Sequence, residues 1–205
     1  MENPGNIIHK GEHFNVTRAD PTIRDVVIGV GWDQKAFEEQ KTDADISLFL
    51  LDRDGQTRED EDFIFYNQPE GCEGAVRHMG DNRTGAGDGD DEMVFVNLNG
   101  LPFDIMKIAI VLSIYDEDGK LGHDFSTVRN VFVRLVNDEN AHEIVRFEIP
   151  DEALEQGGTA MYMAYLRREG PEWFFDASAE KVDGGLAAIA TEHGIIVKEL
   201  QSTGT

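Results

Sequence analysis

The feature that most constrains the fold is a succession of short apolar runs, rich in β-branched and aromatic residues and separated by acidic or glycine-containing turns. We expect strands at residues 14–17, 26–32, 46–51, 62–66, 93–98, 107–115, 131–136, 143–149, 159–166, 173–177 and 195–197. Residues 186–190 favour a short helix and residues 123–128 a single helical turn. Because no long helices alternate with the strands, the pattern predicts an all-β fold, an antiparallel β-sandwich of about ten short strands with one or two short helices.

The length of 205 residues suits one domain. We expect the sandwich to span residues 10–198, with flexible segments at residues 1–9 and 199–205. The formal net charge of −23 argues against nucleic-acid binding, because no basic stripe is present to neutralise phosphates. It also argues against cation-free binding to anionic lipid, but leaves open a contact bridged by calcium.

Cys72 is the only cysteine, which excludes an intrachain disulfide and a cysteine metal cage and favours a reducing compartment. No apolar stretch approaches the roughly 20 residues of a membrane helix. The first residues lack the basic and apolar regions of a signal peptide. We therefore expect a soluble cytoplasmic protein without a transmembrane segment.

An acidic, glycine-rich loop at residues 80–92 holds five carboxylates and four glycines. Such a cluster is either a solvated surface loop or a cation site, and oxygen ligands on a flexible backbone suit Ca²⁺. The loop is not an EF-hand. Counted from Asp81, the twelfth position is Glu92, but Arg83, Gly85 and Ala86 occupy positions that an EF-hand reserves for other residues. A metal site here would have to combine several loops at one end of the sandwich.

Other carboxylates lie where strands begin or end. Asp43 and Asp45 are two residues apart and are expected to share one side of their strand, and Asp90 and Glu92 are expected to continue the face of Val94. The predicted carboxylate ligands are Asp33, Asp43, Asp45, Asp81, Asp88, Asp90, Asp91 and Glu92. Because one Ca²⁺ takes six to eight oxygens, some from backbone and water, this set suits about two ions.

A metal-dependent enzyme is the main alternative. The same carboxylates could hold Mg²⁺ or Mn²⁺ for phosphoester chemistry, with His78 and Arg83 nearby in the sequence. We expect His78 instead to be a surface hydrogen-bonding residue in a loop. Cys72 is expected to be a small packing residue rather than a nucleophile, and Trp32 and Trp173 are expected to be core aromatics.

Six segments resemble the TerD family of tellurium-resistance and stress proteins, and the resemblance extends from about Lys10 to Val197. They are residues 29–33, 43–47, 62–67, 80–92, 132–138 and 172–175. The resemblance implies a β-sandwich that binds two Ca²⁺ and has no established enzyme activity, and it adds Asn67 and Asn82 to the expected ligands. It also implies a bacterial stress-response role, with protein partners in a cytoplasmic complex at the inner face of the membrane.

The sequence departs from the family pattern in two places. The usual Asp-Leu-Asp-Ala-Ser is Asp-Ala-Asp-Ile-Ser at residues 43–47, which keeps both carboxylates and the serine. The usual Trp-Lys-Phe-Arg-Ala is Trp-Phe-Phe-Asp-Ala at residues 173–177. The second change replaces two basic residues with an apolar and an acidic one, so a partner surface in that segment would differ from the family's.

Overall fold

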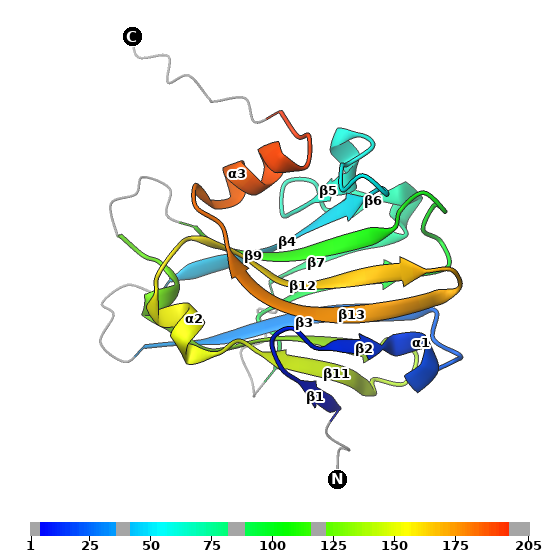
Figure 1. The fold of residues 1–205 in the computed structure, drawn as a ribbon, viewed down its shortest axis with the longest axis horizontal. Helices are drawn as coiled ribbons and strands as arrows, with labels where there is room; N and C mark the ends of the chain where they lie inside the picture. Colours follow the sequence, from blue (N-terminus) through cyan, green and yellow to red (C-terminus); the bar gives the residue numbers. More distant parts are fainter. Residues whose placement is uncertain (1–4, 36–41, 82–88, 116–121, 197–205) are drawn as a thin grey trace.

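The computed structural model describes residues 5–35, 42–81, 89–115 and 122–196. Within these ranges the chain forms two packed sheets (Figure 1). The seven-stranded sheet, here called sheet A, has the order β1-β11-β10-β3-β8-β7-β6. The six-stranded sheet, sheet B, has the order β2-β13-β12-β9-β4-β5. The predicted all-β sandwich is therefore confirmed.

The strands of sheet A are β1 (Asn6–Ile8), β3 (Asp25–Gln34), β6 (Glu70–Gly71), β7 (Val76–Asp81), β8 (Glu92–Asn97), β10 (Val128–Asn137) and β11 (Glu143–Glu148). Those of sheet B are β2 (His13–Asn15), β4 (Asp43–Leu51), β5 (Phe63–Ile64), β9 (Lys107–Tyr115), β12 (Ala160–Glu169) and β13 (Glu172–Lys181). The helices are α1 (Val16–Ala19), α2 (Asp151–Glu155) and α3 (Gly185–Glu192). Neighbouring strands are antiparallel except for β1, which runs parallel to β11.

The main core lies between the sheets, where alternate residues of each strand meet. In β4 the inward residues are Ile46, Leu48 and Leu50. The alternate residues Phe49 and Leu51 pack on the opposite face, against α3, which covers β4, β9 and β12 of sheet B. The apolar run at residues 46–51 is thus buried on both faces, as its composition predicts.

Several sequence expectations need correction. The described ranges hold thirteen strands rather than about ten. Residues 6–8, expected to be part of a flexible N-terminus, form β1, and the strand expected at residues 62–66 is reduced to β5. Residues 195 and 196 are not a strand. These pieces are only two or three residues long and depend on pairing with a distant strand, so local composition carries little signal for them.

Among the described residues, no helix combines the length and apolar character needed to cross a membrane.

Candidate functional site

Glycines in β3 let the base of the acidic loop lie against sheet A. Val26, Ile28 and Val30 of β3 face the main core, so Gly29 and Gly31 face outward. A Cβ at Gly29 would lie 2.3 Å from the Asp90 carboxylate, and one at Gly31 would lie 3.2 Å from the Gly89 carbonyl oxygen. Because the two glycines have no side chains, they leave space for Gly89 and Asp90 at the base of the acidic loop.

Asp90 is held there by Arg134 of β10. The Arg134 Nε and Nη2 atoms donate to the two Asp90 carboxylate oxygens at 2.8 and 3.0 Å, and Nη1 donates to Glu143 at 2.9 Å. Asp90 is only 6% exposed, so this bidentate pair supplies the counter-charge that a buried carboxylate needs. The expectation that Asp90 and Glu92 share one face is wrong. The chain turns at Asp91, and Asp90 lies on the outer face of sheet A.

Glu92 continues the inward face of Val94, as predicted, and links the two sheets. Its Oε2 accepts a hydrogen bond from the backbone N–H of Ile46 in β4 at 2.8 Å. Strand β5 pairs with β4 only at Leu48 and Phe49, so it does not reach the Ile46 amide. The buried carboxylate of Glu92 satisfies that amide and so closes the open edge of β4.

His78 lies on β7 with its side chain 2% exposed, which corrects the expectation of a surface loop residue. Its Nδ1 accepts from the Gly80 N–H at 3.0 Å, so the neutral ring carries its proton on Nε2, which lies 3.5 Å from Glu92 Oε2. Burial would lower the pKa of His78, but the nearby carboxylate of Glu92 outweighs it and raises the pKa above its usual value. A ring enclosed in this way suits a structural pair better than an accessible catalytic base.

Asp33 and Asp91 lie near each other at the surface, beside the base of the acidic loop. Asp91 Oδ2 accepts from the Trp32 N–H at 2.8 Å, and Asp33 Oδ2 accepts from Asn130 Nδ2 at 2.5 Å. Both residues line a cavity of about 760 Å³ on the outer face of sheet A, together with Gly89. Burial raises the pKa of Asp91, and the negative charges of Asp33 and Asp90 raise it further. Negative charge therefore converges at this point.

The remaining predicted ligands are not gathered there. Asp43 is exposed at the start of β4, and Asn67 is exposed in the turn after β5. Asp45 lines a different cavity, beneath α3. The backbone of Asp81 ends β7, while its side chain, Asn82 and Asp88 lie outside the described residues. In the part of the chain that the structure describes, no group of three or more His, Cys, Asp or Glu side chains is arranged to hold a metal.

The sequence interpretation missed Arg134 as a partner of the acidic loop. The available signal was the arginine that interrupts the apolar run at residues 131–136 of β10, where it occupies an outward position between Val133 and Leu135. The expectations for the two tryptophans hold in part, since Trp173 is buried in the core and Trp32 is only partly buried beside it. Burial raises the pKa of the Cys72 thiol, which lowers its thiolate fraction and its nucleophilicity.

The fold and these contacts define a two-sheet β protein that anchors an acidic, glycine-rich loop on one sheet by an internal ion pair. The chain belongs to the TerD domain family, which it matches over residues 6–193. This match begins at β1 rather than at Lys10, in agreement with the pairing of β1 in sheet A.

Relatives of known name carry resistance and stress descriptions. The chain is 39% identical to "Tellurium resistance protein TerD" of Serratia marcescens over 188 residues, covering 92% of this chain and 96% of the relative. It is 42% identical to "General stress protein 16U" of Bacillus subtilis (strain 168) over 189 residues, with the same coverage. The tellurium-resistance and stress-response family is thereby established.

A solved structure from Streptomyces coelicolor A3(2), described as a homologue of telluride resistance protein (TerD), has the same fold. Its TM-score is 0.62 at 19% identity, covering 82% of this chain and 95% of that one. At this identity the likeness supports the fold alone.

Proposed function

We propose that this protein is a non-catalytic, calcium-binding stress-response protein. The observation that carries the proposal is the convergence of Asp33 and Asp91 on one cavity at the base of the acidic loop. Like charges held together disfavour ionisation, and a bound divalent cation relieves that repulsion. The donors offered are carboxylate and backbone oxygens, which suit Ca²⁺ rather than a softer metal.

In this proposal, Asp33 and Asp91 contribute to binding of about two Ca²⁺, with the further oxygens coming from the loop residues Asp81, Asn82 and Asp88. Asp90 and Glu92 have a different part. Because Arg134 holds Asp90 and the Ile46 amide holds Glu92, both would have to give up internal partners to bind an ion. We propose instead that Asp90 and Glu92 fix the backbone on either side of Asp91.

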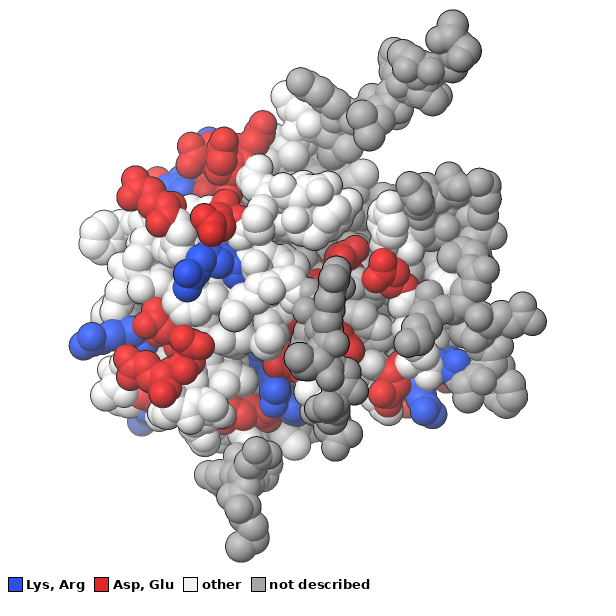
Figure 2. All heavy atoms as spheres, turned by 180° about the vertical axis from the view of Figure 1, so that it is seen from behind, with Lys and Arg blue, Asp and Glu red and all other residues white. Residues whose placement is uncertain are grey.

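The molecular role we propose is that of an adaptor or sensor in a cytoplasmic, membrane-associated complex. Figure 2 shows Asp and Glu side chains in several groups over one face of the molecule, with fewer Lys and Arg. Such a surface repels anionic lipid headgroups and other acidic proteins. Calcium would reduce this repulsion locally, so the ions would control which partner the acidic loop can approach.

The experiment is thermal unfolding with and without calcium, after removal of metal by a chelator. Calcium at about 100 times its Kd adds about 2.7 kcal/mol per site and raises the Tm by roughly 5–10 °C for a domain of this size. Asp33→Asn and Asp91→Asn should each reduce the shift by more than half. Asp138→Asn, an exposed residue of the β10–β11 turn, is the control and should leave the shift unchanged.

An unchanged Tm in the wild-type protein would remove the calcium proposal. The non-catalytic part is tested separately, by a screen of phosphoesters with Mg²⁺ or Mn²⁺. Reproducible turnover that is lost in Asp91→Asn would favour the enzyme alternative instead.

A further inference from the structure

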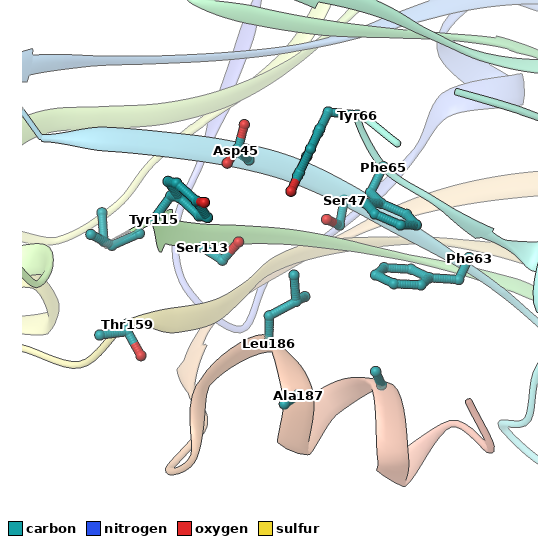
Figure 3. A pocket seen from close by; sticks show the side chains of 12 residues that line it. Asp45, Ser47, Phe63, Phe65, Tyr66, Ser113, Tyr115, Thr159, Leu186 and Ala187 are labelled. Atoms are coloured by element: carbon teal, nitrogen blue, oxygen red, sulfur yellow. The ribbon is translucent and has the colours of Figure 1, made fainter. Parts of the chain in front are cut away.

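A second cavity, of about 300 Å³, lies between α3 and the outer face of sheet B (Figure 3). Most of its lining comes from β4, β9, α3 and β5 with the turn that follows it. An apolar cavity of about 150 Å³ holds one benzene ring, so this volume has room for a molecule of two fused rings. Among the described residues, it shares no lining residue with the cavity of Asp33 and Asp91.

The walls of this cavity are aromatic on one side and aliphatic on the other. The rings of Phe63 and Phe65 stack with centroids 4.5 Å apart and an angle of 15° between their planes. Phe63 also stacks on the buried Phe49, with centroids 4.4 Å apart, which fixes the position of the pair. Leu186 and Ala187 of α3 supply the facing aliphatic surface (Figure 3). A flat aromatic molecule between these walls would bury apolar surface on both of its faces.

Ser47 of β4 places a hydroxyl in the floor of this cavity. Because Ile46 and Leu48 face the main core, Ser47 lies on the opposite face of β4, the face that α3 covers. Its neighbours on that face are apolar, with Phe49 two residues along the strand and Val111 opposite on β9. The serine therefore sets a polar group among apolar side chains.

The Ser47 Oγ has no hydrogen-bond partner among the described residues. Ser47 is only 1% exposed, so its hydroxyl is shielded from bulk water. A buried hydroxyl in this state costs stability, and natural structures rarely keep one without a reason. Alanine would remove this cost with little change in packing, so the retained hydroxyl points to a ligand that completes it. A donor N–H or O–H in the cavity would do so, because a hydroxyl oxygen has two acceptor lone pairs.

We propose that this cavity binds a small planar aromatic molecule that carries an N–H or O–H donor. The ring lies between the phenylalanine stack and Leu186, and the donor forms a hydrogen bond to Ser47 Oγ. The ring stack selects a flat apolar body, and the unpartnered hydroxyl selects a hydrogen-bonding group at its edge. Indole has this shape and a single donor, so it is a suitable probe.

The test compares indole with indene, which has the same two-ring shape without the N–H. The assay is NMR titration of the isotope-labelled full chain in the presence of a chelator. Indole should cause saturable shifts at Ser47 and Ala187 and should bind roughly fivefold more tightly than indene, which is the effect of one hydrogen bond. Ser47→Ala should abolish this preference and retain the binding of indene. Ser126→Ala, at a serine outside the cavity lining, is the matched control and should keep the preference.

Two further measurements distinguish a ligand site from a structural serine. Without ligand, Ser47→Ala should have a urea unfolding midpoint at least as high as that of the wild-type protein, because it removes a buried hydroxyl that has no partner. Ala187→Trp, at an exposed position of α3 that lines the cavity, should fill the cavity and prevent the binding of both probes.

Three results would overturn the proposal. Equal affinity of the wild-type protein for indole and indene would mean that the Ser47 hydroxyl gives the ligand no hydrogen bond, and this comparison needs no variant. Shifts that do not saturate or are not confined to the cavity would remove the site itself. A lower unfolding midpoint in Ser47→Ala would show that the hydroxyl already has a partner. The chelator keeps all three results independent of calcium binding at Asp33 and Asp91.

Discussion

Removal of the Arg134 guanidinium is the sharpest test of how the acidic loop is anchored. Arg134→Leu removes the two hydrogen bonds and the positive charge that Arg134 gives to the Asp90 carboxylate, whose side chain is 5% exposed. Breaking a buried pair in this way costs about 3–5 kcal/mol, and the 24% exposure of the Arg134 side chain places the expected loss near the lower value, about 3 kcal/mol. With a urea m-value of roughly 2 kcal/mol per M, the unfolding midpoint should fall by about 1.5 M.

A double-mutant cycle tests whether the lost contact between Arg134 and Asp90 is the cause. Asp90→Asn in the Arg134→Leu background removes the Asp90 charge, so the double variant should be clearly more stable than the sum of the two single losses predicts.

The assay is urea unfolding followed by circular dichroism, in a buffer with a chelator so that no calcium contributes. A loss below about 1 kcal/mol for Arg134→Leu would refute the anchoring account, because exposed pairs have values in that range. Additive losses in the double variant would refute it as well.

Three further outcomes follow from the same contacts. Gly29→Ala puts a Cβ 2.3 Å from the Asp90 carboxylate and should lower the unfolding free energy by about 1–3 kcal/mol, measured by the same urea assay. Glu92→Ala leaves the buried Ile46 amide without a partner and should cost about 2 kcal/mol, while Glu92→Gln, which keeps an acceptor, should cost less. Although burial opposes it, the hydrogen bonds of Arg146 and Arg134 hold the pKa of Glu143 below its usual value. The stability that Glu143 contributes is therefore fully present above about pH 4.5 and is lost as the pH falls through its lower folded-state pKa. Urea unfolding from about pH 6 to 3 should show this loss as a fall in the unfolding free energy. The fall should be smaller in Arg146→Leu.

The long strands could be predicted from sequence because each carries its own periodic apolar pattern. The expected strand at residues 107–115 coincides with β9, and the helix at residues 186–190 lies inside α3. The short strands β1 and β6 could not be predicted, because their partners Glu143–Glu148 and Val76–Asp81 are fixed only by the tertiary fold. The strand β7 was missed because glycine and charged residues interrupt its apolar pattern.

The sequence indicated where the acidic site lies, but not which of its carboxylates face the cavity and which are held by internal partners. Local density of carboxylates marked the loop at residues 80–92, and the aspartate at the end of β3 does lie beside it. Strand parity failed at Asp90 because the chain bends at Asp91, just before β8 begins, and no local sequence signal shows that bend. The separation of Asp45 from Asp33 depends on which sheet each strand joins, which is a property of the whole fold.

The proposed function requires that the acidic loop and its neighbours bind calcium. Isothermal titration calorimetry of the metal-free protein with CaCl₂ tests it most directly, because it gives stoichiometry and affinity together. We expect about two ions per chain and a weakened site in Asp91→Asn, with binding retained in Asp138→Asn. No measurable binding at millimolar calcium, or binding that is unchanged in both Asp33→Asn and Asp91→Asn, would contradict it.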